Sequence, residues 1–201
     1  NCVFSGNATA LNQTLGTISA TACVFAGNSA AQGGVKAYYG SGVYSACVFS
    51  ANSASALGGA FQITDNTTTL VSCTFSDNAS PNYAAALGIT GTGKAIVSGC
   101  SFGTSQYIQL RENGNITLIG SNALGGKIST RGNTADSDTV TISSGAILNF
   151  SGNTSSVVIK PKGAITFGAN VTIITSAGTS VSLNGGVAGS CNQINHDGTT
   201  A

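Results

Sequence analysis

The acidic residues and the single histidine are where catalysis or metal binding would have to reside in this 201-residue chain. Glycoside-cleaving enzymes need a pair of clustered carboxyl groups, and calcium sites need several oxygen ligands. Only Asp136 and Asp138 are close in sequence, and with Asn133 they could form a weak calcium site. The loop-like context, rich in glycine and polar residues, favours a solvated turn instead. The six acids are Asp65, Asp77, Glu112, Asp136, Asp138 and Asp197.

Other catalytic and cofactor-binding patterns are incomplete as well. His196 is the only histidine and lies beside Asp197 in a polar tail, and no serine has a visible partner that would make it a nucleophile. The stretch Gly91-Thr92-Gly93-Lys94 lacks the first glycine and the final Ser or Thr of a phosphate-binding loop. The absence of any Cys-x-x-Cys pair argues against zinc. We therefore expect no enzyme, no catalytic residues, no metal and no cofactor.

Cysteines are the remaining reactive side chains, and five of the six precede a phenylalanine by two positions. Alternate residues of a strand share a face, so a buried phenylalanine implies that its cysteine is buried too. Two states remain open for these thiols: free, as small hydrophobic groups, or joined in disulfides such as Cys2–Cys23 or Cys47–Cys73. The five are Cys2, Cys23, Cys47, Cys73 and Cys100, and Cys191 stands apart.

These cysteines belong to a repeat, which the elements of the fold must position. Its first part is Cys-x-Phe-x-x-Asn, with successive copies 21, 24, 26 and 27 residues apart, and its second part is a glycine pair. A period in the twenties predicts a solenoid, and the alternating pattern predicts strands that stack in parallel at about 4.8 Å. The fifth copy is degraded, with Ser105 in place of the asparagine. The clearest glycine pairs are Gly33-Gly34-Val35 and Gly58-Gly59-Ala60.

The repeated side chains are interpreted as structural ladders. One ring per turn allows offset stacking in the core, and asparagine suits a sharp bend in which its amide can bond to the next amide along the axis. The phenylalanine column is Phe4, Phe25, Phe49, Phe75 and Phe102. The asparagine column is Asn7, Asn28, Asn52 and Asn78.

The second half of the chain keeps the strand pattern and loses the cysteine. Gly145-Ala146-Ile147 and Gly163-Ala164-Ile165 lie 18 residues apart, which predicts shorter turns in this half. No proline-rich linker or charge run divides the chain. The sequence therefore predicts an all-β fold, a single parallel β-helix domain over residues 1–201 with about nine rungs. Residues 1–102 carry the Cys-x-Phe-x-x-Asn repeats and residues 103–201 the shorter, degenerate rungs.

The paired motifs resemble the repeats of the polymorphic outer-membrane proteins. Phe-x-x-Asn at Phe4/Asn7, Phe25/Asn28, Phe49/Asn52 and Phe75/Asn78, with Gly-Gly-Ala or Gly-Gly-Val, carries the likeness over residues 1–102. Residues 103–201 are similar to autotransporter passenger sequence in general. The resemblance implies a right-handed β-helix, found in surface adhesins and secreted scaffolds.

The composition of the chain limits which binding partners and which cellular location are expected. Charged residues make up 6% of the chain, and the net charge is +1 with no basic run. The sequence therefore lacks the cluster of basic residues that nucleic-acid binding needs. We expect no membrane-spanning segment in this chain and an extracellular or cell-surface location. Because the first residues already belong to a repeat, an uncapped end is expected either to join more protein in the same chain or to stack on further copies of the chain. The predicted function is a structural or adhesive module, a surface-displayed adhesin passenger or a filament subunit, whose partners are copies of itself or a cell-surface receptor.

Two alternative functions are less favoured by the sequence. An ice-binding solenoid would need regular threonine rows, but Thr-x-Thr does not recur at fixed rung positions in the sequence. A polysaccharide-active β-helix enzyme is the least favoured, because the carboxylates are scattered. Tyrosine is favoured at interfaces, so the candidate contact residues, all expected to be exposed, are Tyr38, Tyr39, Tyr44 and Tyr83.

Overall fold

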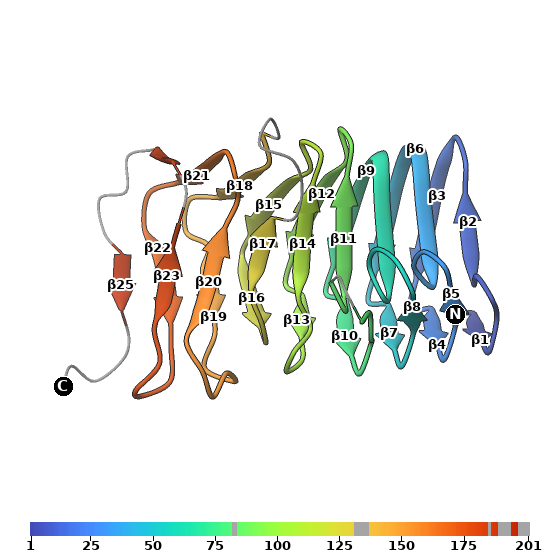
Figure 1. Ribbon diagram of the computed structural model, residues 1–201, viewed down its shortest axis with the longest axis horizontal. Helices are drawn as coiled ribbons and strands as arrows, with labels where there is room; N and C mark the ends of the chain where they lie inside the picture. Colours follow the sequence, from blue (N-terminus) through green and yellow to red (C-terminus); the bar gives the residue numbers. More distant parts are fainter. Residues whose placement is uncertain (82–83, 131–136, 185, 189–193, 197–201) are drawn as a thin grey trace.

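A computed structural model describes residues 1–81, 84–130, 137–184, 186–188 and 194–196 of the chain. The described residues form short strands joined by turns and loops, without a helix. Every strand pair is parallel, and the strands coil into an elongated stack with the N-terminus at one end (Figure 1). The predicted all-β parallel β-helix is confirmed.

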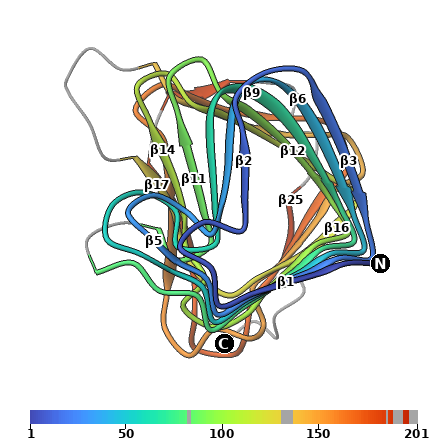
Figure 2. The same cartoon turned by 90° about the vertical axis from the view of Figure 1, so that its right-hand side faces the viewer.

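Three faces surround the core, as the view along the coil shows (Figure 2). The first face is a nine-stranded sheet built from one strand of each turn. Seen from the N-terminal end, the chain runs clockwise around the three faces as it recedes, so the coil is right-handed. The strands of the first face are β1 (Val3–Ser5), β4 (Val24–Ala26), β7 (Val48–Ser50), β10 (Thr74–Ser76), β13 (Ser101–Phe102), β16 (Ser121–Leu124), β19 (Ile147–Asn149), β22 (Val171–Ile174) and β25 (Ile194–His196).

The second and third faces belong to one continuous sheet, because β6 (Val35–Ser45) and β9 (Phe61–Val71) each run across both. The second face contains the first halves of these two strands with β2 (Leu11–Gln13), β11 (Leu87–Thr90), β14 (Ile108–Arg111), β17 (Ile128–Thr130), β20 (Val157–Lys160) and β23 (Val181–Leu183). The third face contains their second halves with β3 (Thr17–Thr21), β12 (Lys94–Ser98), β15 (Asn115–Ile119), β18 (Thr139–Ile142), β21 (Ala164–Phe167) and β24 (Gly186–Ala188).

The corner between the second and third faces requires left-handed backbone. Tyr39 in β6 and Asp65 in β9 have φ angles of 47° and 49°, which turn each long strand from one face to the next. Aspartate tolerates this region better than most residues, whereas a bulky side chain there is uncommon. At the corner between the first and second faces, loops project outward, and two of them pair through β5 (Ser29–Ala30) and β8 (Ser53–Ala54).

Strand alternation places the core. On every face, alternate side chains point inward and are buried, as in β12, where Ala95 and Val97 are buried and Lys94 is exposed. The inward residues stack in register from turn to turn into one continuous core. Because most of the inward residues are Val, Ile, Leu and Phe, burial of their apolar surface is the main stabilising contribution.

The chain completes about seven turns between β1 and β22, slightly fewer than the nine rungs predicted. Turn length varies around the second half: Leu87, Ile108 and Ile128 are register partners on the second face, and successive members lie only 21 and 20 positions apart. Ile116, Val140 and Ile165 are register partners on the third face, and successive members lie 24 and 25 positions apart. The 18-residue spacing was misleading because its two motifs lie on different faces. Ile147 belongs to β19 on the first face, and Ile165 to β21 on the third.

Candidate functional site

The phenylalanine column forms an uninterrupted stack inside the first face. The ring of Phe25 lies 5.0 Å from the rings of Phe4 and Phe49, with interplanar angles of 4° and 6°. Phe75 continues the stack to Phe49 and Phe102 at 4.8 and 4.7 Å. Each such pair contributes about 0.5–1.5 kcal/mol beyond the burial of its surface. The rings therefore hold the spacing of the first five turns.

The asparagine column is a hydrogen-bonded ladder at the bend after each Phe strand. The Asn52 side-chain Oδ1 accepts hydrogen bonds from both the backbone N–H and the Nδ2 of Asn28, at 3.0 and 2.9 Å. The Asn52 Nδ2 donates to the carbonyl of Phe25 in the preceding turn and to Asn78 Oδ1 in the next. Asn7 donates to Asn28 in the same way. Each amide thus ties three turns together.

Two members of this ladder were missed in the sequence. Gln106, and not Ser105, takes the asparagine's place in the fifth turn: its Oε1 accepts from Asn78 Nδ2 and its Nε2 donates to the Asn78 carbonyl. Glutamine's extra methylene compensates for its position one residue later. Asn153 donates to the Leu124 carbonyl of the preceding turn, as Asn28 does to Phe4. The signal for Asn153 was present, because Phe150-Ser151-Gly152-Asn153 repeats the Phe-x-x-Asn spacing.

The cysteine column lies beside the phenylalanines, and the thiols are free. Cys23, Cys47, Cys73 and Cys100 are buried, whereas Cys2 is exposed. The buried thiols donate to backbone carbonyls, for example Cys73 Sγ to the Tyr44 carbonyl at 3.2 Å. Burial raises the pKa of Cys47, and the hydrogen bond with Cys100 together with burial raises that of Cys73. Cys47 and Cys73 therefore behave as inert core groups, whereas the hydrogen bond with Cys73 lowers the pKa of Cys100. Cys191 lies outside the described residues.

The position that cysteine occupies in the first five turns is taken by other residues in the turns that follow. Asn122 stands in the next position, is fully buried, and accepts the backbone N–H of Cys100 through its Oδ1 at 3.0 Å. Leu148 follows in register with Asn122 on the next turn, and Ile173 after it. The same column thus changes from thiols to an amide and then to aliphatic side chains.

The four candidate contact tyrosines do not form one surface. The expectation that Tyr44 is exposed is wrong: its side chain is fully buried, with its ring 4.9 Å from that of Phe61 in an edge-on arrangement. Alternation explains the error, because Tyr44 occupies an inward position of β6. Tyr39 is 53% exposed at the corner, and Tyr38 is half-buried with its hydroxyl 2.6 Å from Gln32 Oε1. Tyr83 lies outside the described residues.

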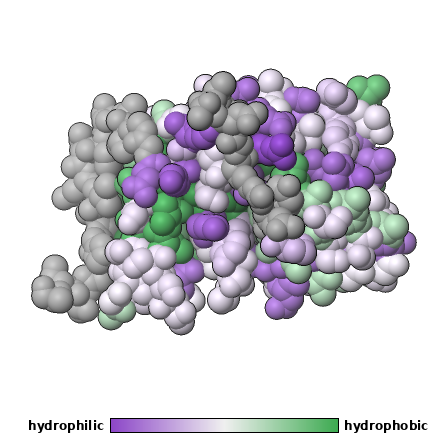
Figure 3. Space-filling view, in the orientation of Figure 1, coloured by the Kyte–Doolittle hydropathy of each residue, from purple (hydrophilic) through white to green (hydrophobic). Residues whose placement is uncertain are grey.

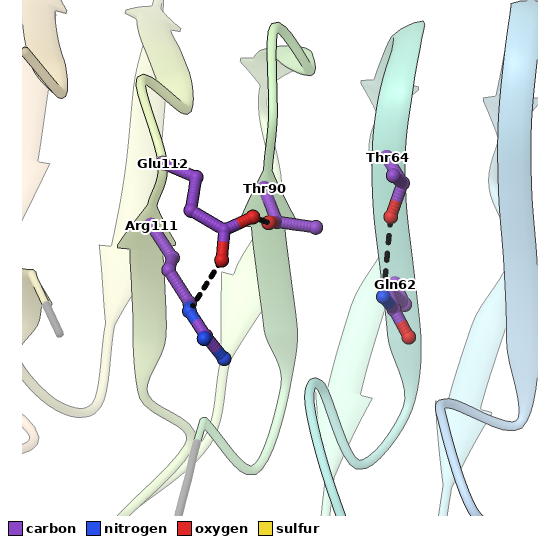
Figure 4. A network of polar contacts seen from close by, with 5 residues as sticks. All are labelled: Gln62, Thr64, Thr90, Arg111 and Glu112. Atoms are coloured by element: carbon purple, nitrogen blue, oxygen red, sulfur yellow. Dashed lines mark hydrogen bonds and ion pairs between the residues drawn. The ribbon is translucent and has the colours of Figure 1, made fainter. Parts of the chain in front are cut away.

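Carboxylates are scattered and mostly occupied in turns. Asp65 Oδ1 accepts from the backbone N–H and the hydroxyl of Thr92. Glu112 forms an ion pair with Arg111 at 2.9 Å and accepts a hydrogen bond from the Thr90 hydroxyl (Figure 4). On β9, the Gln62 side chain donates a hydrogen bond to the Thr64 hydroxyl. No three His, Cys, Asp or Glu residues gather in a metal-like cluster within the described part of the chain. Of the three residues considered for a weak calcium site, Asn133 and Asp136 lie outside that part. Asp138 is fully buried, so the favoured interpretation of this stretch as a solvated turn is wrong for Asp138.

The remaining acids lie in separate parts of the chain, one of them beside the histidine. Asp77 lies at the bend after β10, where its backbone has a φ angle of 55°. His196 ends β25, and Asp197 lies outside the described residues.

The outward side of the third face carries columns of hydroxyl and β-branched side chains. Thr67-x-Thr69 and Thr139-x-Thr141 occupy the same two columns, so the statement that Thr-x-Thr does not recur at fixed positions is wrong for this face. Lys94 and Asn115 interrupt the hydroxyl groups of the first column, and Val43 and Ile96 those of the second. The first column is Thr17, Ser41, Thr67, Lys94, Asn115 and Thr139, and the second is Ser19, Val43, Thr69, Ile96, Thr117, Thr141 and Thr166.

A groove opens on the second face, where the outward loops become shorter. Its volume is about 220 Å³, and it lies beside β14, β17 and β20. Tyr107, which sequence reasoning missed, lines it together with Lys127, whose Nζ lies 5.2 Å from the centre of the Tyr107 ring. This groove brings an aromatic ring, a cation and several hydroxyls together in one hollow.

Comparisons with models of protein families, with curated proteins and with solved structures find no match to this chain. The part of the chain that the structure describes has no helix of the length and apolar character needed to cross a bilayer.

Proposed function

We propose that this chain is a structural and adhesive β-helix, secreted or displayed on a cell surface, of the kind found in polymorphic outer-membrane proteins and autotransporter passengers. The observation that carries the proposal is the direction of the repeated side chains. Phenylalanine, asparagine and buried cysteine, the residues that define the repeat, point inward and bond turn to turn. The repeat thus maintains a rod, and the outward positions are free to contact partners.

The outward faces fit such a role. The third face spans several turns as an even sheet in which Lys94 is the only charged residue among its described outward positions. A surface with few charges approaches another surface without strong repulsion. Serine and threonine provide hydrogen-bonding groups without the entropy loss of long side chains. These properties suit attachment to a large surface better than capture of a small molecule.

Display of the chain on a non-adherent bacterium tests the proposal. We expect cells that carry the chain to attach to host-cell or glycan-coated surfaces several-fold more than cells that carry an unrelated β-helix passenger. Replacing the third-face residues Thr69, Thr117 and Thr141 with lysine should reduce attachment if this face makes contact. Attachment equal to that of the control cells would overturn the adhesive function. Fibres seen by electron microscopy of the purified chain would instead favour a filament subunit, and turnover in a polysaccharide-degradation screen would overturn the non-catalytic proposal.

Ice binding is a second candidate, which the threonine columns of the third face favour. Three successive strands, β15, β18 and β21, present Thr117, Thr141 and Thr166 in one column. Parallel strands fix the spacing between such side chains at about 4.8 Å, which gives a regular array of methyl and hydroxyl groups. Ice binding predicts thermal hysteresis that increases in Ile96→Thr, which joins Thr69 to this column, and that is lost in Thr141→Lys. No hysteresis in either the parent chain or Ile96→Thr would remove this candidate.

A further inference from the structure

The groove of the second face combines features that recognise a particular class of ligand. Its walls carry exposed hydroxyl groups from two loops: Thr104 and Ser105 from one turn, and Thr154, Ser155 and Ser156 from a later turn. Val158 adds an apolar wall between them. In the space-filling view, hydrophobic surface lies over the region of β20 with hydrophilic patches beside it (Figure 3). Hydroxyls around an apolar floor match the mixed surface of a sugar ring.

Tyr107 is held in a defined orientation at this groove. Its ring lies against Gly126 of the next turn, where an added Cβ would come within 2.4 Å of the ring carbon Cδ1. Glycine is therefore required for the ring to occupy this position. The ring is half-buried, so part of it remains open to solvent. A positioned aromatic ring with an accessible part is a suitable platform for stacking a ligand ring.

Lys127 supplies the charge. Its side chain is exposed, and its ammonium group lies over the Tyr107 ring at 5.2 Å. Such a contact between a cation and an aromatic ring is weakly attractive at an exposed site, and it restrains the lysine without neutralising its charge. Within the described part of the chain, Arg111 and Glu112 form an ion pair that does not involve Lys127, so the lysine can meet an external anion.

A second cation stands on the adjacent strand. Lys160 is exposed at the end of β20, and its register partner Ser129 follows Lys127 by two residues. Strand spacing and rise per residue put the two lysine Cα atoms about 8 Å apart on the same outward side. No carboxylate lines the groove. The surface beside the hydroxyls is therefore positive, in a chain whose net charge is only +1.

We propose that this groove binds an acidic polysaccharide, with Tyr107 stacking on a sugar ring and Lys127 and Lys160 pairing with its anionic groups. The inference deepens the adhesive function proposed above and rests on it, because it names the class of surface that the rod would contact. Uronic acids and sulfated sugars share the required chemistry. Charge-assisted hydrogen bonds from lysine are stronger than neutral ones, so the anionic groups decide the selectivity.

Titration of the full chain with three soluble glycans tests the proposal: oligogalacturonate, dextran sulfate and neutral dextran. We expect binding of one or both acidic glycans, no binding of neutral dextran, and an affinity that falls as salt is added. Preference for oligogalacturonate would identify carboxylates as the ligand groups, and preference for dextran sulfate would identify sulfate esters. Equal binding of neutral dextran, or no binding of either acidic glycan, would overturn the inference.

Matched variants separate a built site from diffuse attraction. Lys127→Gln should weaken binding roughly 5-fold, since an exposed ion pair is worth up to about 1 kcal/mol. Lys94→Gln, which removes an exposed cation on the third face, should leave binding unchanged. Tyr107→Phe should bind nearly as the parent does, whereas Tyr107→Ala should bind weakly. Equal losses in Lys127→Gln and Lys94→Gln would show that no specific groove exists.

Two controls distinguish a failure of this inference from a loss of folding and from a failure of the adhesive function. Lys127 and Lys94 are both exposed, so their variants should unfold at the same denaturant concentration as the parent. If displayed cells attach to surfaces although the purified chain ignores both acidic glycans, this inference fails and the adhesive function stands. If neither occurs, both proposals fail.

Discussion

At the scale of single residues, the amides of the asparagine ladder carry several bonds each. The Asn52 side chain accepts two hydrogen bonds and donates two, all of them in the interior. A buried polar group that loses its partner costs more than the bond itself contributed. The ladder is therefore a point where a small change affects neighbouring turns on both sides.

Asn52→Ala should destabilise the chain by roughly 3–5 kcal/mol, because it removes the acceptor of the buried Asn28 backbone N–H and of the Asn28 Nδ2, together with the donor to the Phe25 carbonyl and to Asn78 Oδ1. Urea unfolding followed by circular dichroism measures the loss. Asn12→Ala serves as the control, since Asn12 is exposed, and should change stability by less than about 0.5 kcal/mol. Equal stability of the two variants would show that the ladder bonds contribute nothing net.

Alkaline pH should weaken the fold through Cys47 and Tyr44. Burial raises the pKa of both groups in the folded chain, so they stay neutral there when the unfolded chain already ionises. Their contribution is complete below the unfolded pKa values, about 8.5 for Cys and 10 for Tyr, and declines as pH rises above each. The free energy of unfolding should fall above about pH 8.5 and more steeply above about pH 10.

Tyr44→Phe checks the upper part of this pH profile. The Tyr44 hydroxyl is buried without a hydrogen-bond partner, so its removal should leave stability unchanged or raise it by about 1 kcal/mol near neutral pH. The variant should also lose the steeper decline above about pH 10. A decline identical to that of the parent chain would assign the alkaline effect to other groups.

At the scale of strands and turns, the sequence is informative where one residue type recurs in register. The recurring phenylalanines from Phe4 to Phe102 made the first face predictable, because identical residues stack on one another in register from turn to turn. Tyr44 was misassigned because its loop-like surroundings hid its inward place in β6. Gln106 was missed because a longer side chain one position later reaches the same bonds.

Features that depend on neighbouring turns were less accessible from sequence. The groove at Tyr107 and Lys127 joins residues from three turns, and the threonine columns appear only when the register of the strands is known. Gly125 and Gly126 form a glycine pair that is visible in the sequence. The sequence does not reveal that the Tyr107 ring of the preceding turn occupies the space where a side chain at Gly126 would lie. Register, which loop length sets, is the information that was lacking.

Glycine at position 125 should be irreplaceable for a reason that belongs to this scale. An added Cβ would lie 2.0 Å from the Gly103 carbonyl oxygen of the preceding turn, and backbone cannot move aside cheaply. Gly125→Ala should cost about 2 kcal/mol or more. Gly152→Ala, where no atom lies within 4 Å of the added carbon, should have little effect on thermal unfolding. Similar melting temperatures for both variants would contradict the close approach of the turns.

At the scale of the whole molecule, the rod is stabilised by burial and by backbone bonds, with few charges. One ion pair, Arg111–Glu112, is found in the described part of the chain, and it is largely exposed. Surface pairs of this kind contribute between 0 and about 1 kcal/mol. Stability should therefore respond little to dissolved salt, whereas glycan binding at the groove should respond strongly.

The free energy of unfolding should change by less than about 1 kcal/mol between about 0.05 M and about 0.5 M sodium chloride. Denaturation by urea, which is uncharged, measures this without adding ions. A markedly larger change, in either direction, would mean that charges contribute more to the fold than their number suggests.

The asparagine ladder also bears on how such a rod changes length. Each amide meets an equivalent amide on either side, so duplication of one whole repeat, such as residues 24–47, would insert a new turn without leaving any partner unmatched. The rod would grow by one strand spacing, about 4.8 Å, per copy. Unequal recombination between repeats could therefore set the reach of the molecule in fixed steps while its outer faces diverge independently.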